Sequence, residues 1–360
     1  MQAPIDAQLD ALHRALRDVA PGTPLREGLD RTVRAKMGAL VVVGDGSDVL
    51  SICSGGFLLD APYSPQRLSE LAKMDGAIIL AKDCSRIARA NVHLVPDPNV
   101  PTSETGTRHR TAERVARHLR TVPVISVSEE MSVLTVYVGE SKHVLQEIPR
   151  LLDKAGQALQ TLGRYKLRLD EAVASLSALE VEDLVTLRDV ASVAQRSETV
   201  RRIADEIATM IIELGVDARL LRLQFDELYG DTDTDLELVL RDYLGAESES
   251  AVAGALERLS ELTDDELLDS KAAALVLRVE DAVDLDHPLQ PRGYRLLTEL
   301  PRLSAESIAC VVNQFGTLAK VLRATAEELA TCPGLDRDKA RGIKEGLARL
   351  AEVSILDQYN

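Results

Sequence analysis

The stretch GALVVVG, residues 38–44, decides the class of fold. Five consecutive apolar residues between two glycines are typical of a strand covered on both faces, because a half-exposed strand would alternate apolar with polar residues. A second run of this kind, AIILAK, occupies residues 77–82. Between the two, SPQRLSELAKM at residues 64–74 spaces its apolar residues as an amphipathic helix does. Strand, helix and strand in this order predict an α/β domain with a central mixed sheet.

Further segments extend the sheet on either side of these runs. We predict strands in VLSICSG (49–55), RIARANVHLV (86–95), PVISVS (123–128) and VLTVYVG (133–139). Residues 45–48, DGSD, would then form a hairpin turn after the first strand. Their glycine also suggests a nucleotide loop, but the GxGxxG spacing and the Lys-Ser/Thr ending of a phosphate-binding loop are both missing.

The pattern changes twice further along the chain. Residues 144–287 repeat apolar residues at intervals of three and four, which predicts an all-α spine. DLDHPLQPRG, residues 284–293, breaks that pattern with two prolines and a glycine, and short helices with tight turns are expected after it. We therefore predict three domains, at residues 1–143, 144–287 and 288–360.

The composition excludes several classes of protein. The chain has 360 residues, of which 45% are hydrophobic and 28% charged, so it can form two or three domains with cores of their own. Its apolar runs fall far short of the roughly 18 residues that cross a bilayer, and the N-terminus lacks a signal-peptide pattern. The four cysteines form no CxxC pair, which argues against a zinc site or a disulfide framework. We predict a cytoplasmic protein without membrane contact.

Positive charge is local in this acidic chain. The net charge is −16, which disfavours binding to polyanions in general. Residues 288–360 hold 10 Lys and Arg against 9 Asp and Glu, a net charge of +1, so residues 1–287 carry −17. Within that acidic part, ETGTRHRTAERVARHLR at residues 104–120 holds five Arg and two His against two Glu. This cluster requires an explanation of its own.

The cluster suits a polyphosphate. TGTRHRT, residues 105–111, precedes a helix that we expect from about Thr111 to Arg120. The N-terminus of a helix attracts anions through its unpaired N–H groups, and guanidinium groups bind phosphate oxygens in pairs. Thr107 and Thr111 add hydroxyl groups. A solvated basic helix start is the alternative interpretation from the residue types alone.

A second candidate is KMDGAIIL, residues 73–80. Helix, Asp-Gly and strand are the usual order of a turn between a helix and a strand, in which Gly76 would take the left-handed conformation. The functional alternative gives Asp75 a divalent cation, because Mg²⁺ and Mn²⁺ prefer carboxylate and phosphate oxygens. The position of Asp75 before its strand, rather than after it, is unusual for a site in an α/β domain.

Together these motifs resemble a known family. DGA (75–77) and RHR (108–110), the latter within GTRHRTAER, resemble the paired motifs of diadenylate cyclase domains. The order of cyclase domain, helical spine and C-terminal helix-hairpin-helix module resembles the DNA integrity scanning family of bacteria over essentially the whole chain. SGGF (54–57) and RANVHLVPDP (89–98) agree with that family as well.

The resemblance implies a diadenylate cyclase, an enzyme that joins two ATP into cyclic di-AMP and releases two pyrophosphates. Two cyclase domains would face each other about a two-fold axis in a homo-oligomer, which the family resemblance makes an octamer. By motif, Asp75, Arg108, His109 and Arg110 would be catalytic, and Asp75 would bind Mg²⁺ or Mn²⁺. The residues implied in ATP binding are Gly76, Leu94, Thr107, Arg108, His109, Arg110, Thr111 and Ser128.

The C-terminal stretch AEELATCPGLDRDKARGIKEGL, residues 326–347, resembles a helix-hairpin-helix, in which backbone N–H groups meet DNA phosphates. Gly334-Leu335-Asp336 replaces the usual Gly-hydrophobic-Gly and puts a carboxylate near the phosphate. The predicted DNA contacts are Gly334, Lys339, Arg341 and Lys344, with a solvated helix face as the alternative for the three cations.

The resemblance also implies that branched DNA binds without sequence preference and lowers the cyclase activity. The alternative function is a non-catalytic scaffold that binds DNA junctions and retains a nucleotide pocket. Intact DGA and RHR motifs favour the enzyme, whereas Asp336 makes the DNA-binding half the weaker prediction.

Overall fold

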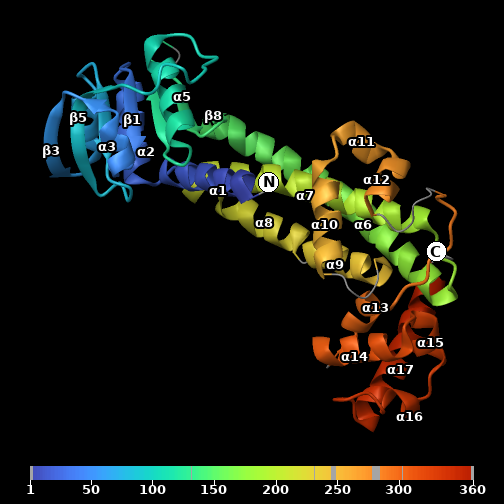
Figure 1. The fold of residues 1–360 in the computed structure, drawn as a ribbon. Coiled ribbons are helices and arrows are strands. Elements are labelled where there is room, and N and C mark those ends of the chain that lie inside the picture. Colours follow the sequence, from blue (N-terminus) through green and yellow to red (C-terminus); the bar gives the residue numbers. More distant parts are fainter. Residues whose placement is uncertain are drawn as a thin grey trace. The chain divides into compact units, whose positions relative to one another are not determined.

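The computed structural model describes residues 3–130, 132–230, 232–244, 249–277, 284–301 and 303–357 (Figure 1). These residues form two compact units. The first unit comprises Met1–Gln157 and Ile207–Leu223, and the second comprises Ala158–Glu206 and Gln224–Asn360. Among the described residues, no helix is both long enough and apolar enough to span a membrane.

An eight-stranded mixed sheet forms the centre of the first unit, as the sequence predicts. Its strands are β1 Ala39–Val43, β2 Cys53–Ser54, β3 Phe57–Pro62, β4 Ala77–Leu80, β5 Arg86–Leu94, β6 Val124–Val127, β7 Leu134–Val138 and β8 Ser141–Val144. The order is β2-β5-β4-β1-β6-β7-β8, with β3 also paired to β5. β1 and β4 run parallel, and the other pairs are antiparallel.

Helices cover both faces of this sheet. They are α1 Ala3–Asp18, α2 Pro24–Arg34, α3 Ser47–Ser51, α4 Pro65–Leu71 and α5 Thr107–Leu119. Leu16, Leu29 and Leu68 of α1, α2 and α4 pack with Val41 and Ile78 on one face. On the other face, α3 and α5 contribute Val49, Ala112, Val115 and Ala116, which pack with Val42 and Ile79. Coverage on both sides explains why β1 and β4 are continuous apolar runs.

The register brings several strand ends to one edge of the sheet. Ala39, at the start of β1, lies opposite Val127 at the end of β6. Ala77, at the start of β4, pairs with Val92 near the end of β5. The start of β7 and the end of β8 reach the same edge. This edge therefore holds the starts of β4, β1 and β7 and the ends of β5, β6 and β8.

Two parts of the sheet differ from the sequence-based prediction. The expected hairpin turn at 45–48 and strand at 49–55 are wrong, because Ser47–Ser51 is a short helix and only Cys53–Ser54 is extended. A hairpin partner cannot pair with β1, since β4 and β6 already occupy both of its sides. Strands β3 and β8 were not predicted from the sequence.

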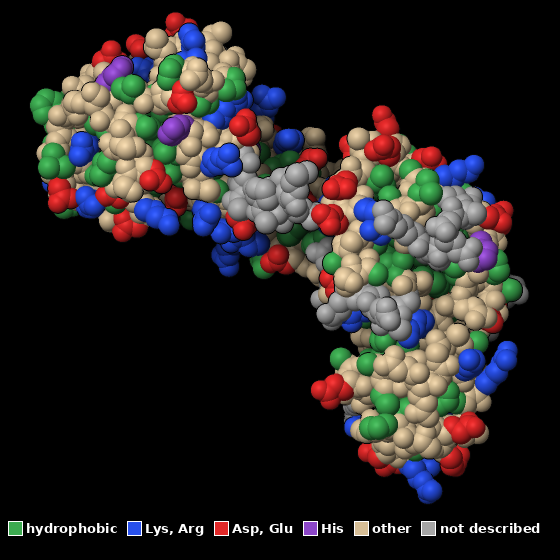
Figure 2. Space-filling model, in the orientation of Figure 1, with side chains coloured by type: hydrophobic (Ala, Val, Ile, Leu, Met, Phe, Trp, Pro, Cys, Tyr) green, Lys and Arg blue, Asp and Glu red, His purple; other side chains and the backbone are tan. Residues whose placement is uncertain are grey.

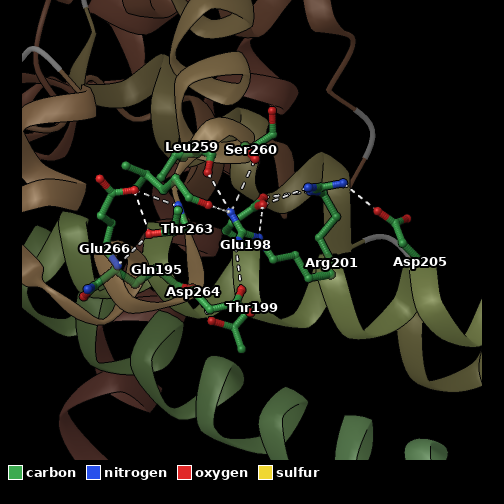
Figure 3. A network of polar contacts seen from close by, with 12 residues as sticks. Gln195, Glu198, Thr199, Arg201, Asp205, Leu259, Ser260, Thr263, Asp264 and Glu266 are labelled. Atoms are coloured by element: carbon green, nitrogen blue, oxygen red, sulfur yellow. Dashed lines mark hydrogen bonds and ion pairs between the residues drawn. The ribbon is translucent and has the colours of Figure 1, made fainter. Parts of the chain in front are cut away.

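Long helices follow the sheet, as predicted for the spine. They are α6 Ile148–Glu182, α7 Leu187–Leu214, the 3₁₀ turn η1 Gly215–Ala218, α8 Arg219–Tyr229, α9 Thr232–Tyr243, α10 Glu249–Glu261, α11 Asp264–Leu268 and α12 Ser270–Leu277. A buried carboxylate, Glu198 of α7, is paired with Nε of Arg201 at 2.7 Å and Nε of Arg202 at 2.8 Å (Figure 3). Arg202 also pairs with Asp264 at the start of α11 and donates to the carbonyl of Leu259 in α10, so this network ties α7 to both helices.

The last helices are short and form their own core. They are α13 Tyr294–Thr298, α14 Ala305–Phe315, α15 Leu318–Arg323, α16 Ala326–Leu329 and α17 Arg337–Asp357. Leu296, Val312, Val321, Leu329 and Ile343 are buried together, one from each helix. The helical region is thus confirmed, and α16, a short connection and α17 match the helix, hairpin and helix predicted there.

A buried polar cluster attaches α13 to the spine. Asp242 of α9 accepts hydrogen bonds from the backbone N–H groups of Gly293 at 2.7 Å and Arg295 at 3.1 Å. The guanidinium of Arg295 in turn pairs with buried Glu180 of α6 at 2.5 Å. Burial, followed by the charge of Glu180, raises the pKa of Asp242 to about 7, although the hydrogen bonds from the N–H groups of Arg295 and Tyr294 lower it.

This cluster predicts a pH-dependent stability. The folded pKa of Asp242 lies above the ordinary value of 3.8, so the folded state binds more protons between these two pH values. We expect the free energy of unfolding to fall as pH rises from about 4 toward 7 and then to level off, and Asp242→Asn to remove this contribution. Thermal melting across this pH range tests the expectation, with exposed Asp226→Asn as the control. An equal slope in the wild type and Asp242→Asn would contradict it.

Candidate active site

The RHR motif lies in the first turn of α5 rather than before the helix. The helix begins at Thr107, four residues earlier than the sequence suggests, because Gly106 precedes it with a φ of 78°. Glycine adopts this conformation without strain, and it has no side chain that could accept the N–H groups of the first turn. Ala112, Val115 and Ala116 anchor the rest of the helix in the core. The start of α5 is therefore a fixed anion-binding end.

Two cavities meet at this helix start and share Thr107 and Arg108. The Asp75 cavity has a volume of about 280 Å³ and is lined by the starts of β1 and β4 and the end of β5. The Ser128 cavity, about 520 Å³, lies on the other side of the same residues and is lined by the loop after β6 and by β7 and β8. Both open at the sheet edge where the strand ends gather.

The structure brings most of the predicted residues together. Asp75, Gly76, Leu94 and Thr111 line the Asp75 cavity with Thr107 and Arg108. His109 and Ser128 line the Ser128 cavity. Arg110 differs from the others, because it is exposed and the described linings of both cavities leave it out.

Gly76 is required for a reason that the sequence did not reveal. The expectation of a left-handed turn is wrong, since Gly76 is not among the glycines with positive φ. A Cβ added there would lie 2.6 Å from the carbonyl carbon of Asn91 and 2.7 Å from its Cα. Asn91 itself has a φ of 54°, at an irregularity in the pairing of β4 with β5. Gly76 thus permits the close approach of two backbones at the floor of the cavity.

Arg108 is held by a second close approach. A Cβ added to Gly38, just before β1, would lie 2.0 Å from Nη1 of Arg108. The guanidinium therefore lies directly against the backbone of Gly38, within the Asp75 cavity. Gly38 belongs to the strand run GALVVVG, and its role was not predicted because the contact joins residues far apart in the sequence.

His109 is oriented by a buried tyrosine. Its Nδ1 lies 2.9 Å from the hydroxyl of Tyr137 on β7, and the two rings meet edge to face with centroids 6.3 Å apart. Burial lowers the pKa of His109; the charge of Glu104 opposes this, and Lys142 and Arg108 reinforce it. Burial, followed by the charge of Glu104, raises the pKa of Tyr137, so its hydroxyl stays protonated. No local pattern in the sequence pointed to Tyr137.

A buried glutamate fixes the loop before the helix. Glu113 of α5 accepts hydrogen bonds from the hydroxyl of Thr102 and from the backbone N–H of Ser103, the latter at 2.9 Å. Burial raises the pKa of Glu113, but these hydrogen bonds and the charge of Arg117 outweigh it, and the net pKa is lowered. The carboxylate thus stays ionised and holds the loop that leads to Gly106.

The donor set fits a divalent cation shared with a substrate. Among the described residues, no group of three or more His, Cys, Asp or Glu is placed to hold a metal ion. Mg²⁺, however, is commonly held by one or two carboxylates together with substrate phosphates and waters. Exposed Asp75, facing a cavity that continues to a phosphate-binding helix start, can supply such a single carboxylate.

The predicted DNA contacts are separate from this site. Gly334 has a φ of 84°, which fits a hairpin glycine, and it is exposed together with Lys339 and Arg341. Asp336 accepts the backbone N–H of Lys339 at 2.8 Å, so it serves as a cap at the start of α17. The ammonium group of Lys344 donates to the carbonyl of Leu322. Lys344 is therefore already used within the fold, and its contact with DNA stays a prediction.

The fold and the site define a nucleotide-binding domain with an anion-binding helix start, joined to a helical region. Residues 26–142 match the family of domains described as "DisA bacterial checkpoint controller nucleotide-binding". Residues 145–285 match the family described as "DisA bacterial checkpoint controller linker region". These descriptions cover the sheet and most of the long helices.

Whole-chain relatives agree with this assignment. The chain is 51% identical to "DNA integrity scanning protein DisA" of Frankia alni over 97% of this chain and 98% of that protein. It is 51% identical to that of Acidothermus cellulolyticus over 97% and 96%, and 49% identical to that of Streptomyces coelicolor over 98% and 96%. The chain belongs to the DNA integrity scanning protein (DisA) family, and it is a diadenylate cyclase, a nucleotidyltransferase.

The contact between Gly76 and Asn91 generates a prediction. In Gly76→Ala the new methyl group would overlap the backbone of Asn91, so a strand must shift. We expect a loss of about 1–3 kcal/mol in the free energy of unfolding. Gly156→Ala in α6 is the control, because a Cβ there meets open space. Denaturant unfolding compares the two, and equal stability of both variants would show that β4 and β5 adapt without cost.

Proposed function

We propose that the cyclase reaction, which joins two ATP into cyclic di-AMP and releases two pyrophosphates, takes place at this site, with each chain presenting one ATP. The observation that carries the proposal is the junction of two cavities at Thr107 and Arg108. An ATP molecule has an apolar base and ribose at one end and a polyanion at the other. The Asp75 cavity, with buried Leu94, suits the adenosine, and the start of α5 suits the phosphates.

Several groups would hold the triphosphate. Arg108 offers a guanidinium to phosphate oxygens, and the open first turn of α5 offers backbone N–H groups. His109 and Ser128 line the larger cavity, where the pyrophosphate would lie. Charge that moves onto the departing pyrophosphate would meet donors that are already in place.

Asp75 would hold Mg²⁺ or Mn²⁺ together with phosphate oxygens. When bound, the cation would neutralise phosphate charge and favour the attacking 3′-oxygen. The turn between α4 and β4 holds the Asp75 carboxylate at the Asp75 cavity, where the cation would bind.

The symmetry of the product favours two facing chains. Each chain has one such pair of cavities, and a cyclic dinucleotide needs two ATP molecules in opposite orientation. Arg110 is exposed in the first turn of α5 and would be available to a facing chain. Phe57 and Leu58 are 55% and 77% exposed on β3, where Phe57 pairs with Ala90 next to the Asp75 cavity. We infer a homo-oligomer with face-to-face cyclase domains; an octamer rests on family resemblance alone.

We propose a weak, sequence-independent DNA contact for the C-terminal domain. Gly334 gives the hairpin conformation, and exposed Lys339 and Arg341 follow it. On the face drawn in Figure 2, basic and acidic side chains are interspersed on this part of the molecule. A net charge of +1 over residues 288–360 supports modest affinity, which several copies in an oligomer would increase. Branched DNA as the ligand, and lowered cyclase activity on binding, follow from family resemblance.

The proposed division of labour follows the predicted domains. Residues 1–143 would carry the cyclase site, residues 144–287 the spine, and residues 288–360 the DNA contact. The described positions of Asp75, Arg108 and His109 at one sheet edge support the first assignment.

The cyclase is tested with Asp75→Asn. Wild-type protein with ATP and either Mg²⁺ or Mn²⁺ is expected to form cyclic di-AMP and pyrophosphate, resolved by chromatography. Asp75→Asn is expected to lose at least about 100-fold in rate, because its amide is a poor ligand for the cation. Asp153→Asn, an exposed position on α6, removes the same charge and should keep the wild-type rate. No product from oligomeric wild-type protein would leave the scaffold function instead.

The DNA contact is tested at Asp336. Asp336→Asn can still cap α17, but it removes the negative charge that faces a phosphate at the hairpin. We expect several-fold tighter binding to a branched DNA and a steeper dependence on salt, measured by fluorescence anisotropy. Asp338→Asn is the control, because it removes the same charge two residues further along, in the first turn of α17. Equal gains in both variants would mean that only net charge matters.

A further inference from the structure

Strand β8 has contacts on both of its faces. It is the last strand in the order of the sheet and pairs with β7 alone. Lys142 lies opposite Tyr137, and the next residue, His143, lies opposite Val136. Successive side chains of a strand point to opposite faces, so Lys142 and His143 carry separate interactions.

On the side of the Ser128 cavity, Lys142 begins a chain of polar contacts. Its ammonium group lies 2.5 Å from Oε1 of Glu104. The Glu104 carboxylate lies close enough to the Tyr137 hydroxyl to add to the rise in pKa that burial causes there. The Tyr137 hydroxyl has a single proton. If that proton is donated to Glu104, the hydroxyl oxygen accepts the Nδ1–H of His109 across 2.9 Å.

This arrangement leaves only Nε2 of His109 available to a substrate in the Ser128 cavity. Nδ1 is used by Tyr137, and among the residues described Nε2 has no hydrogen-bond partner. Lys142, Glu104 and His109 all line the Ser128 cavity. A shift of Lys142 would move Glu104, and with it the Tyr137 hydroxyl that orients the His109 imidazole.

On the opposite face of β8, His143 contacts Glu213 of α7. Nε2 of His143 lies 2.6 Å from Oε2 of Glu213, and Oε1 of Glu213 accepts the backbone N–H of Gln146 at 2.7 Å. Glu213 is only 3% exposed. One carboxylate thus holds both the strand and the chain just after it. β8 pairs with β7 alone, so the contacts of Glu213 give this strand a second attachment.

We propose that Glu213 is a positioning residue for His109, acting through His143 and β8 on the Lys142, Glu104 and Tyr137 contacts. The inference rests on the proposed role of His109 in the cyclase reaction. It assigns to α7, a helix beyond the residues that match the nucleotide-binding family, an indirect effect on the site.

The test measures turnover and substrate affinity separately. Glu213→Ala releases β8, and we expect kcat to fall about tenfold with the KM for ATP little changed, since a small misplacement of a catalytic group costs rate more than binding. Glu213→Gln can still accept the Gln146 N–H and should recover most of the rate. Lys142→Met, at a side chain that is 47% exposed, should show the same fall in kcat without a risk to folding.

A double-variant cycle separates positioning from general stability. Tyr137→Phe keeps the buried ring and removes the hydroxyl. If the contacts act as a unit, Glu213→Ala should cause little further loss in the Tyr137→Phe background. Glu206→Ala, an exposed glutamate on the same helix, should leave the rate unchanged.

Two results would overturn the inference. One is a full loss from Glu213→Ala in the Tyr137→Phe background, which would mean an independent structural role. The other is a raised KM with unchanged kcat in Lys142→Met, which would mean direct contact of Lys142 with phosphate. His109→Ala distinguishes the two proposals: an active His109→Ala refutes the role of His109 itself, whereas an inactive one beside a fully active Glu213→Ala refutes only the positioning.

Discussion

The site depends on the placement of the α5 N-terminus at one edge of the sheet. Ala112, Val115 and Ala116 fix the helix in the core, and Gly106 starts it at a conformation that other residues adopt only with strain. The first turn then presents Thr107, Arg108 and His109 between two cavities. Gly38, against Arg108, and Tyr137, beside Nδ1 of His109, help to keep these residues in place.

The placement also explains how an acidic protein can bind a polyanion. A net charge of −16 repels phosphates at long range, but that repulsion is screened within about 10 Å at ordinary salt concentrations. At contact distance, the helix start and the guanidinium of Arg108 dominate, because charged hydrogen bonds act over a few ångströms. The surrounding acidity would then disfavour long nucleic acids without affecting a small nucleotide. Local geometry and net charge therefore act on different ligands.

Sequence patterns predicted the parts of this structure that local chemistry determines. β1 and β4 are continuous apolar runs because both faces are covered. The DGA motif lies in the Asp75 cavity, and Arg108 of the RHR motif lies where the two cavities meet, whereas Arg110 lies outside both linings.

The errors and omissions come from contacts between distant segments. Residues 47–51 cannot continue into a hairpin strand beside β1, because β1 has partners on both sides, which no short window of sequence can reveal. Gly76 faces Asn91, and Lys142 pairs with Glu104, for the same reason. β3 and β8 lie at the ends of the sheet, where half-exposed strands lack a strong apolar pattern.

The two helix starts for which a phosphate contact is proposed use one physical effect in opposite ways. At α5 the residue before the helix is Gly106, which leaves the first N–H groups open to an external anion. At α17 the corresponding residue is Asp336, whose carboxylate accepts the N–H of Lys339. An internal cap already supplies the negative charge that a DNA phosphate would bring, so a phosphate must either displace it or approach against its charge. The same reasoning that favours tight binding of a nucleotide at α5 therefore favours only weak binding of a phosphate at α17. This agrees with the weak DNA contact proposed for the C-terminal domain, whose affinity several chains together would raise.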